Sequence, residues 1–381
     1  MADEEGGPAY VAEDEGVVVA DLCDDEADGE AHEDEDATDD AATVLQVHDG
    51  AVYAVAWSAC SHHVACGGGD DVAHVAGAPT AVQVAALHAH QDSVSAVSFA
   101  MDGRALATGG LDGCVCVWDV STAQKQWQWD GPSQGMEWVD WHPRGHVVLA
   151  GAEDGSTWMW DAQKGKLMNS FHGHGGSVTC GRFTPDGTRV VTASEDASLK
   201  VWDPKTGNCI HTLQRNPFHD QAINAMHISQ DSTVAITGAV DGSVRVANIQ
   251  TGRVLGKLEG HTDSVETVGF SNTLPLCATG GLDHKLCIWD LHTLTLRASK
   301  EHPDSVIKLL WHPQEPLVYT ACVDGNVRLW DARTMECIQM FRGHSDAILD
   351  MALSPDGEWI ITGSDDCTVR IFCRNRSSMD T

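Results

Sequence analysis

The sequence has few basic residues. Only 23 Lys and Arg stand against 56 Asp and Glu, which gives a formal net charge of −33. A phosphate backbone repels a surface of this charge, so direct binding of nucleic acid is not expected. The same charge favours a basic protein or peptide as the partner.

Long apolar runs are also missing. No stretch of 18 apolar residues occurs, so no membrane span is expected. The N-terminus has neither a basic segment nor an apolar segment of the signal-peptide type. The 13 cysteines are an odd number and are scattered along the chain, which favours reduced, buried thiols. Reduced thiols are typical of proteins of the cytoplasm and the nucleus, and we expect the protein there. Cys114 and Cys116 could suggest a metal site. Because alternate strand residues share one buried face, we expect them in the core and predict no metal or cofactor.

Residues 1–40 contain 18 acidic residues and no Lys or Arg. They have too few large apolar side chains to offset the entropy of ordering, so we predict a disordered acidic tail. The tail could simply aid solubility or could capture a basic client, and the sequence leaves both roles open. We predict a folded domain over residues 41–376 and a short C-terminal tail over residues 377–381.

A repeat runs from residue 43 to residue 373. Its clearest copy, residues 173–203, contains His174, a Pro-Asp-Gly turn, Asp196 and Trp202. The key aspartates recur every 41–45 residues, at Asp70, Asp112, Asp154, Asp196, Asp241, Asp283, Asp324 and Asp366. This period, ending in Trp-Asp, is typical of four-stranded propeller blades, and the repeats resemble the WD-repeat family.

Eight repeats predict an all-β, eight-bladed propeller. The last repeat ends near Cys373 after three strands, so we expect residues 41–47 to supply the fourth. Closure of this kind removes the free sheet edges. We expect the propeller to be a monomer.

Four repeats contain a complete set of His, Thr, Asp and Trp. A His, an Asp and a hydroxyl resemble a catalytic triad, but an enzyme does not need four copies of one site. The resemblance to WD-repeat proteins implies a structural network instead, in which Asp binds His, His binds Thr and Thr binds the indole. We therefore predict no catalysis. The four sets are His90, Thr108, Asp112 and Trp118; His174, Thr192, Asp196 and Trp202; His261, Thr279, Asp283 and Trp289; and His302, Thr320, Asp324 and Trp330.

Two repeats depart strongly from this pattern. The first has Cys66 in place of Thr and Ala76 in place of Trp, and the third has Pro132 for His and Ala150 for Thr. We expect these two blades to be less stable, or to be held by other contacts.

Two positions in each repeat are expected to face the mouth of the central channel. One lies five residues after the His, and the other directly precedes the key Asp. The acidic members are Glu137, Glu153, Glu195, Glu266 and Asp365, and the apolar anchors are Tyr53, Leu111, Leu282, Ile307 and Leu349. The bases near these loops are mainly Arg215, Lys285, Lys300 and Arg342, so this face is predicted to be strongly negative. Such a mouth suits a Lys/Arg-rich peptide with apolar anchors.

The third repeat carries a closer resemblance. Its segments 137–144 (EWVDWHPR) and 149–160 (LAGAEDGSTWMW) contain paired tryptophans that are not general repeat features. Together with the acidic N-terminus they resemble the angio-associated migratory cell protein family. The resemblance implies a chaperone of a newly made basic protein of the large ribosomal subunit. It also leaves open a signalling or trafficking scaffold linked to cell migration, binding several partners.

Overall fold

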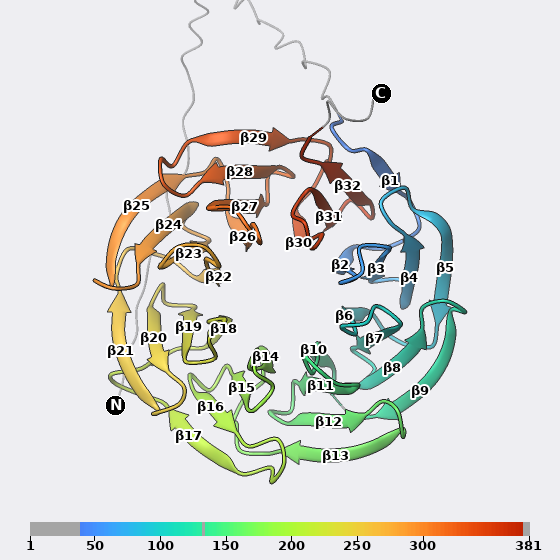
Figure 1. Cartoon of the computed structure of the whole chain (residues 1–381), viewed down its shortest axis with the longest axis horizontal. Helices are drawn as coiled ribbons and strands as arrows, with labels where there is room; N and C mark the ends of the chain where they lie inside the picture. The colour runs from blue at the N-terminus through green and yellow to red at the C-terminus, as the bar shows by residue number, and fades with distance from the viewer. Residues whose placement is uncertain (1–38, 132–133, 376–381) are drawn as a thin grey trace, which may run out of the picture. The chain divides into compact units, whose positions relative to one another are not determined.

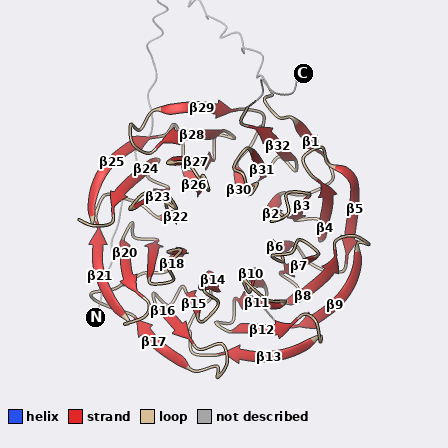
Figure 2. Ribbon diagram, viewed as in Figure 1, coloured by secondary structure: helices blue, strands red, loops and turns tan. Residues whose placement is uncertain are grey.

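The computed structural model describes residues 39–131 and 134–375. These residues form 32 strands and no helix, in eight four-stranded antiparallel sheets arranged as blades around a ring (Figures 1 and 2). The predicted all-β, eight-bladed propeller is confirmed. The predicted acidic tail through residue 38, Pro132 and the predicted C-terminal tail lie outside the described residues. Within the described part, no helix is long and apolar enough to cross a membrane.

The first four blades follow one another in sequence, and each is listed from its innermost to its outermost strand. Blade one is β2 (Val52–Trp57), β3 (His63–Gly68), β4 (Val72–Gly77) and β5 (Val82–His88); blade two is β6 (Val94–Phe99), β7 (Ala105–Gly110), β8 (Cys114–Asp119) and β9 (Gln124–Asp130); blade three is β10 (Met136–Trp141), β11 (Val147–Ala152), β12 (Thr157–Asp161) and β13 (Lys166–Phe171); blade four is β14 (Cys180–Phe183), β15 (Val190–Ala193), β16 (Leu199–Trp202) and β17 (Cys209–Leu213).

The other four blades complete the ring. Blade five is β18 (Ile223–Ile228), β19 (Val234–Ala239), β20 (Val244–Asn248) and β21 (Arg253–Leu258); blade six is β22 (Val265–Phe270), β23 (Leu276–Gly281), β24 (Lys285–Asp290) and β25 (Thr295–Glu301); blade seven is β26 (Val306–Trp311), β27 (Leu317–Cys322), β28 (Val327–Asp331) and β29 (Cys337–Phe341); blade eight is β30 (Ile348–Leu353), β31 (Trp359–Ser364), β32 (Val369–Cys373) and β1 (Thr43–Leu45).

The core lies between neighbouring blades rather than within one of them. Val75 and Leu87 of blade one, for example, pack in one buried cluster with Leu106 and Trp118 of blade two. Strand residues alternate between the two faces of a sheet, so each blade presents one apolar face to each neighbour. The ring is therefore needed to bury both faces of every blade.

Blade eight closes the ring with a strand from the start of the chain. β1 pairs antiparallel with β32, and Thr43 lies opposite Ile371. The strand expected over residues 41–47 is therefore present in a shorter form. Asp39 and Asp40, which the predicted boundary assigns to the tail, already contact blade eight and its neighbour. Asp39 Oδ2 lies 3.3 Å from Arg370, and the Asp40 N–H donates to the Arg342 carbonyl.

Blade two shows the polar network in its complete form. His90 Nδ1 lies 3.1 Å from Asp112, His90 Nε2 lies 2.8 Å from the Thr108 hydroxyl, and Trp118 Nε1 donates to that hydroxyl at 3.0 Å. Because Nδ1–H donates to the carboxylate, Nε2 accepts from the hydroxyl. Blades four and six repeat the arrangement, and there the indole-to-hydroxyl distance is 2.8 Å.

Blade seven differs from the predicted set. His302 and Trp330 both bond Thr320 at 3.0 Å, but Asp324 binds the guanidinium of Arg328 with both carboxylate oxygens. A two-point pair with a guanidinium competes strongly for a carboxylate. His302 Nδ1 is consequently buried without a hydrogen-bond partner among the described residues.

Blade three, which lacks the network, is held by tryptophans. Trp160 stacks on Trp129 of blade two, with ring centroids 5.2 Å apart, and lies 6.1 Å from Trp158. Ala150 is fully buried in the same core cluster as these tryptophans. Stacked aromatic pairs add about 0.5–1.5 kcal/mol beyond the area they bury, so other contacts compensate for the missing hydroxyl here.

Candidate functional site

A central channel of about 820 Å³ is lined by the innermost strands of the blades. In seven blades the residue five positions after the His lies in an irregularity of the innermost strand, where pairing shifts by one residue, as it does around Glu137 between Met136 and Trp138. A bulge leaves its extra residue unpaired and re-aims its side chain. Six of these seven residues line the channel, whereas Ile307 of blade seven is not among the lining residues.

One backbone hydrogen bond holds the two predicted mouth positions near each other in every blade. The N–H of the residue preceding the key Asp donates to the carbonyl of the residue two before the other mouth position. In blade three, for example, Glu153 donates to Gly135, and Gly135 precedes Glu137 by two residues. The eight pairs, donor first, are Gly69 and Ala51, Leu111 and Ser93, Glu153 and Gly135, Glu195 and Ser177, Val240 and Ala222, Leu282 and Ser264, Val323 and Ser305, and Asp365 and Ala347.

Three of the five predicted carboxylates form one group, here called the acidic cluster: Glu137, Glu153 and Glu195. Burial raises the pKa of Glu137, and the charges of Glu153 and Glu195 raise it further, against a lowering effect of the Ser177 hydroxyl, which donates to Glu137 at 3.1 Å. Glu153 and Glu195 are exposed, whereas Glu137 is half-buried. Within the described residues, no ion pair joins these three side chains to a Lys or Arg.

The other two predicted acids lie apart from this cluster. Glu266 accepts hydrogen bonds from Ser264 at 2.5 Å and from Asn224 at 3.2 Å, so neighbouring side chains already satisfy it. Asp365 is exposed at the edge of blade eight. Sequence spacing placed all five at equivalent positions, but the structure brings only the members from blades three and four together.

The predicted apolar anchors also differ among themselves. Leu111 is 39% exposed and lies beside Glu153, since a β-carbon built on Gly135 would lie 2.9 Å from Leu111 Cδ2 and 3.1 Å from Glu153 Oε1. Tyr53 is 44% exposed and its ring lies against Gly69. Of the other three anchors, Leu282 is exposed, and Ile307 and Leu349 are half-buried. Leu111 is therefore the anchor placed best to act with the acidic cluster.

Four further bases lie in strands after the key Asp and were not counted when the charge of this face was predicted. The position four residues after the key Asp carries a basic residue in four blades, namely Lys200, Arg245, Arg328 and Arg370. Arg245, for example, donates to the carbonyls of Pro217 and Phe218 in the loop before β18. A count of bases in turns misses these strand residues, although their fixed distance from the Asp is visible in the sequence.

Two groups of described residues have side chains close enough to hold a metal ion: His48, Cys66 and His74, and His312, Glu315 and Glu358. In the second group Arg374 already lies 2.7 Å from Glu315 and 3.7 Å from Glu358. That group is therefore an ion-pair cluster. In the first group, no Lys or Arg side chain is paired with the three residues among the described contacts. The sequence analysis considered only Cys114 and Cys116 as metal ligands and did not find this group.

Two family models match the chain. The model described as "WD domain, G-beta repeat" matches residues 41–75, 81–119, 124–161 and 165–203. The model described as "WDR36/Utp21 second beta-propeller domain" matches residues 210–379. The chain is therefore a WD-repeat β-propeller protein, and neither model describes an enzyme.

Among its relatives is the human angio-associated migratory cell protein. It is 37% identical over 182 residues, which are 44% of this chain and 42% of that protein. Human WD repeat-containing protein 36 is 30% identical over 156 residues, or 40% of this chain and 17% of that protein. The aligned segments thus span less than half the length of either relative.

The fold is also that of solved structures. Chaetomium thermophilum Sqt1, bound to the N-terminus of the ribosomal protein L10, matches with a TM-score of 0.81 and 24% identity over 88% of this chain and 100% of that chain. Saccharomyces cerevisiae Sqt1 matches with the same TM-score and 23% identity, over 88% of this chain and 99% of that one. At this identity the likeness establishes the fold alone.

Proposed function

We propose that the protein binds a basic, extended peptide segment at the mouth of its channel, as an escort of a newly made basic protein of the large ribosomal subunit. The observation that carries the proposal is the acidic cluster, in which burial and the charges of Glu153 and Glu195 raise the pKa of Glu137. Within the described residues, no ion pair with a Lys or Arg compensates these carboxylates. An incoming Lys or Arg would relieve that cost of ionisation. In support, the structurally similar Sqt1 holds the N-terminus of a ribosomal protein.

Charge alone would not give tight binding. An exposed ion pair contributes about 0.2–1 kcal/mol, so three pairs give at most about 3 kcal/mol. A nanomolar complex needs about 12 kcal/mol. The remainder has to come from apolar burial and two-point arginine contacts, and Leu111 next to Glu153 offers both kinds of surface in one place. We therefore propose a peptide that places an apolar side chain between two basic ones.

Titration of the full chain with a fluorescent peptide from the N-terminus of ribosomal protein L10 tests this function. We expect Glu137→Lys and Glu195→Lys each to weaken binding by about 10-fold or more, since each replaces an attraction by a repulsion. Glu336→Lys is the matched control, because it makes the same change of charge in the turn between β28 and β29, on the opposite face of the ring.

The salt dependence separates this function from the alternative scaffold role. Capture by carboxylates weakens as ionic strength rises. If both cluster variants bind as tightly as the wild type and the Glu336→Lys control, the site is wrong. Partners retained at high salt by all variants would instead favour a scaffold that binds them elsewhere. We place the escort role in the cytoplasm or nucleus.

A further inference from the structure

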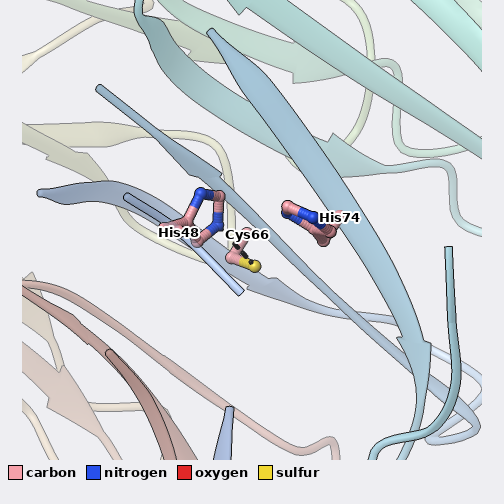
Figure 3. Close-up of side chains that lie close together, drawn as sticks. All are labelled: His48, Cys66 and His74. Atoms are coloured by element: carbon pink, nitrogen blue, oxygen red, sulfur yellow. Dashed lines mark hydrogen bonds between the residues drawn. The ribbon is translucent and has the colours of Figure 1, made fainter. Parts of the chain in front are cut away.

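Blade one carries an unusual group of side chains at the place of the polar network. Cys66 occupies the Thr position, Ala76 occupies the Trp position, and His74 occupies the position that is basic in four other blades. Figure 3 shows His48, from the loop before β2, and His74, from β4, on the two sides of Cys66 in β3. Cys66 and His74 are register partners in the sheet.

The distances bring three potential metal ligands, two imidazoles and one thiol, close together. His48 Nε2 lies 3.1 Å from Cys66 Sγ, and the rings of His48 and His74 are 4.7 Å apart at 89°. One ligand atom from each residue lies within 4.8 Å of the other two. The exposed fractions are 7% for His48, 3% for Cys66 and 8% for His74, so all three residues are shielded from solvent.

His74 has an unsatisfied nitrogen in this group. Its Nδ1 is buried and has no hydrogen-bond partner among the described residues. An orphaned buried polar atom costs about 1–3 kcal/mol, so its retention requires an explanation. In addition, Ala76 removes the indole that donates to the hydroxyl in other blades, which leaves the Cys66 sulfur without that donor.

The geometry points to a His₂Cys site for one thiophilic d¹⁰ metal ion, Zn²⁺ or Cu⁺, held by His48, Cys66 and His74. Thiolate and imidazole are the ligands that both ions prefer. On binding, the Cys66 S–H bond breaks, a sulfur–metal bond forms, and the proton passes to bulk water. This site is independent of the acidic cluster and of the proposed function.

Asp70 supports the site from outside. It lies 2.9 Å from His48 Nδ1 and also accepts the N–H groups of Asp49 and Val72. The bond from Nδ1–H to the carboxylate fixes the tautomer and turns the Nε2 lone pair toward Cys66. A carboxylate behind a metal-binding histidine is the usual outer arrangement of such sites.

Metal content of the full-length, reduced protein tests the site. The protein is stripped with a chelator and dialysed against Zn²⁺ or, without oxygen, against Cu⁺, and bound metal is counted by mass spectrometry. Cys66→Thr introduces the Thr that six other blades have at the equivalent position. His74→Arg introduces the Arg that three other blades have at the position four residues after the key Asp. Both substitutions therefore suit the fold. Cys277→Ala is the control, because Cys277 is a buried cysteine outside the group.

We expect one ion per chain in the wild type and in Cys277→Ala. Affinity should fall by more than about 10-fold in Cys66→Thr and in His74→Arg, since outer-shell changes alone cost about 10–100-fold. Co²⁺ should give a thiolate charge-transfer band in the wild type that disappears in Cys66→Thr. Circular dichroism checks that this variant is folded. The proposal is overturned if the wild type binds no ion, or if both variants bind the ion as tightly as the wild type. Binding of only one of the two metals identifies the ion.

Discussion

Asp324 and Arg328 form an ion pair in which Arg328 is buried and Asp324 is partly exposed, with side-chain exposures of 5% and 19%. Removing one member of a buried pair leaves an uncompensated charge and costs about 3–5 kcal/mol. We therefore expect Asp324→Asn to lower the free energy of unfolding by about 3 kcal/mol, measured by urea denaturation.

A second variant identifies the source of that loss. Asp324→Asn combined with Arg328→Gln removes both charges and should recover most of the stability, because no buried charge remains. The exposed Asp365→Asn should change stability by less than about 0.5 kcal/mol. If the double variant is no more stable than Asp324→Asn alone, the ion pair does not explain the altered network of blade seven.

The hydrogen-bond partner of each key Asp is only partly predictable from the spacing of the repeats. Arg370 has the same spacing from Asp366 that Arg328 has from Asp324, yet His344 keeps its bond to Asp366 at 2.8 Å. The difference lies in Asp39, which lies 3.3 Å from Arg370 and shares its charge. That partner is distant in sequence, so the repeat pattern gives no sign of it.

At the scale of elements, Trp138 locks blades three and four together. Its indole N–H donates to the Val178 carbonyl at 2.8 Å, and a β-carbon built on Gly181 would lie 2.2 Å from the ring. We expect Gly181→Ala to lower the free energy of unfolding by about 1–3 kcal/mol, since overpacking forces the ring to move. Urea denaturation measures this loss.

Gly145→Ala is the matched control for this substitution. The nearest neighbour of its added methyl group lies 3.4 Å away, at His142 Nδ1, which is an ordinary contact. Stability within about 0.5 kcal/mol of the wild type is expected there. Equal effects of the two alanines would mean that intrinsic backbone preference, and not the position of Trp138, sets the requirement for glycine.

Blade three shows which part of an element the sequence could not predict. Because blade three lacks the His and the Thr of the network, we expected it to be weaker or to be held by other contacts. The structure shows such other contacts. The sequence contains the necessary tryptophans, but Trp129 belongs to β9 of the preceding blade and stacks on Trp160 across the interface. Pairing between blades depends on how two sheets face each other, and periodicity within one repeat does not encode that.

At the scale of the whole molecule, the period of the key aspartates was enough to predict eight blades and their closure. The sequence predicted the three residues of the acidic cluster as mouth positions, but it did not predict that these three lie together. Equivalent positions around a ring do not all lie close to one another. The group of His48, Cys66 and His74 was not predicted at all. Its signal was present, since one repeat replaces two network residues and places a histidine four residues after the Asp.

Ring closure makes the stability of the whole propeller depend on three residues. β1 covers β32, and Leu45 is 92% shielded, which contributes about 1.5–3 kcal/mol. Without β1, the N–H and C=O groups of β32 become an open edge that can pair with another molecule. We expect a chain lacking residues 1–46 to unfold at a lower temperature than one lacking residues 1–38, and to associate in light scattering. Both truncations remove residues 1–38, and only the longer one also removes Asp39, Asp40 and β1. Identical unfolding temperatures and equal masses in solution would show that the other blades hold the ring closed without this segment.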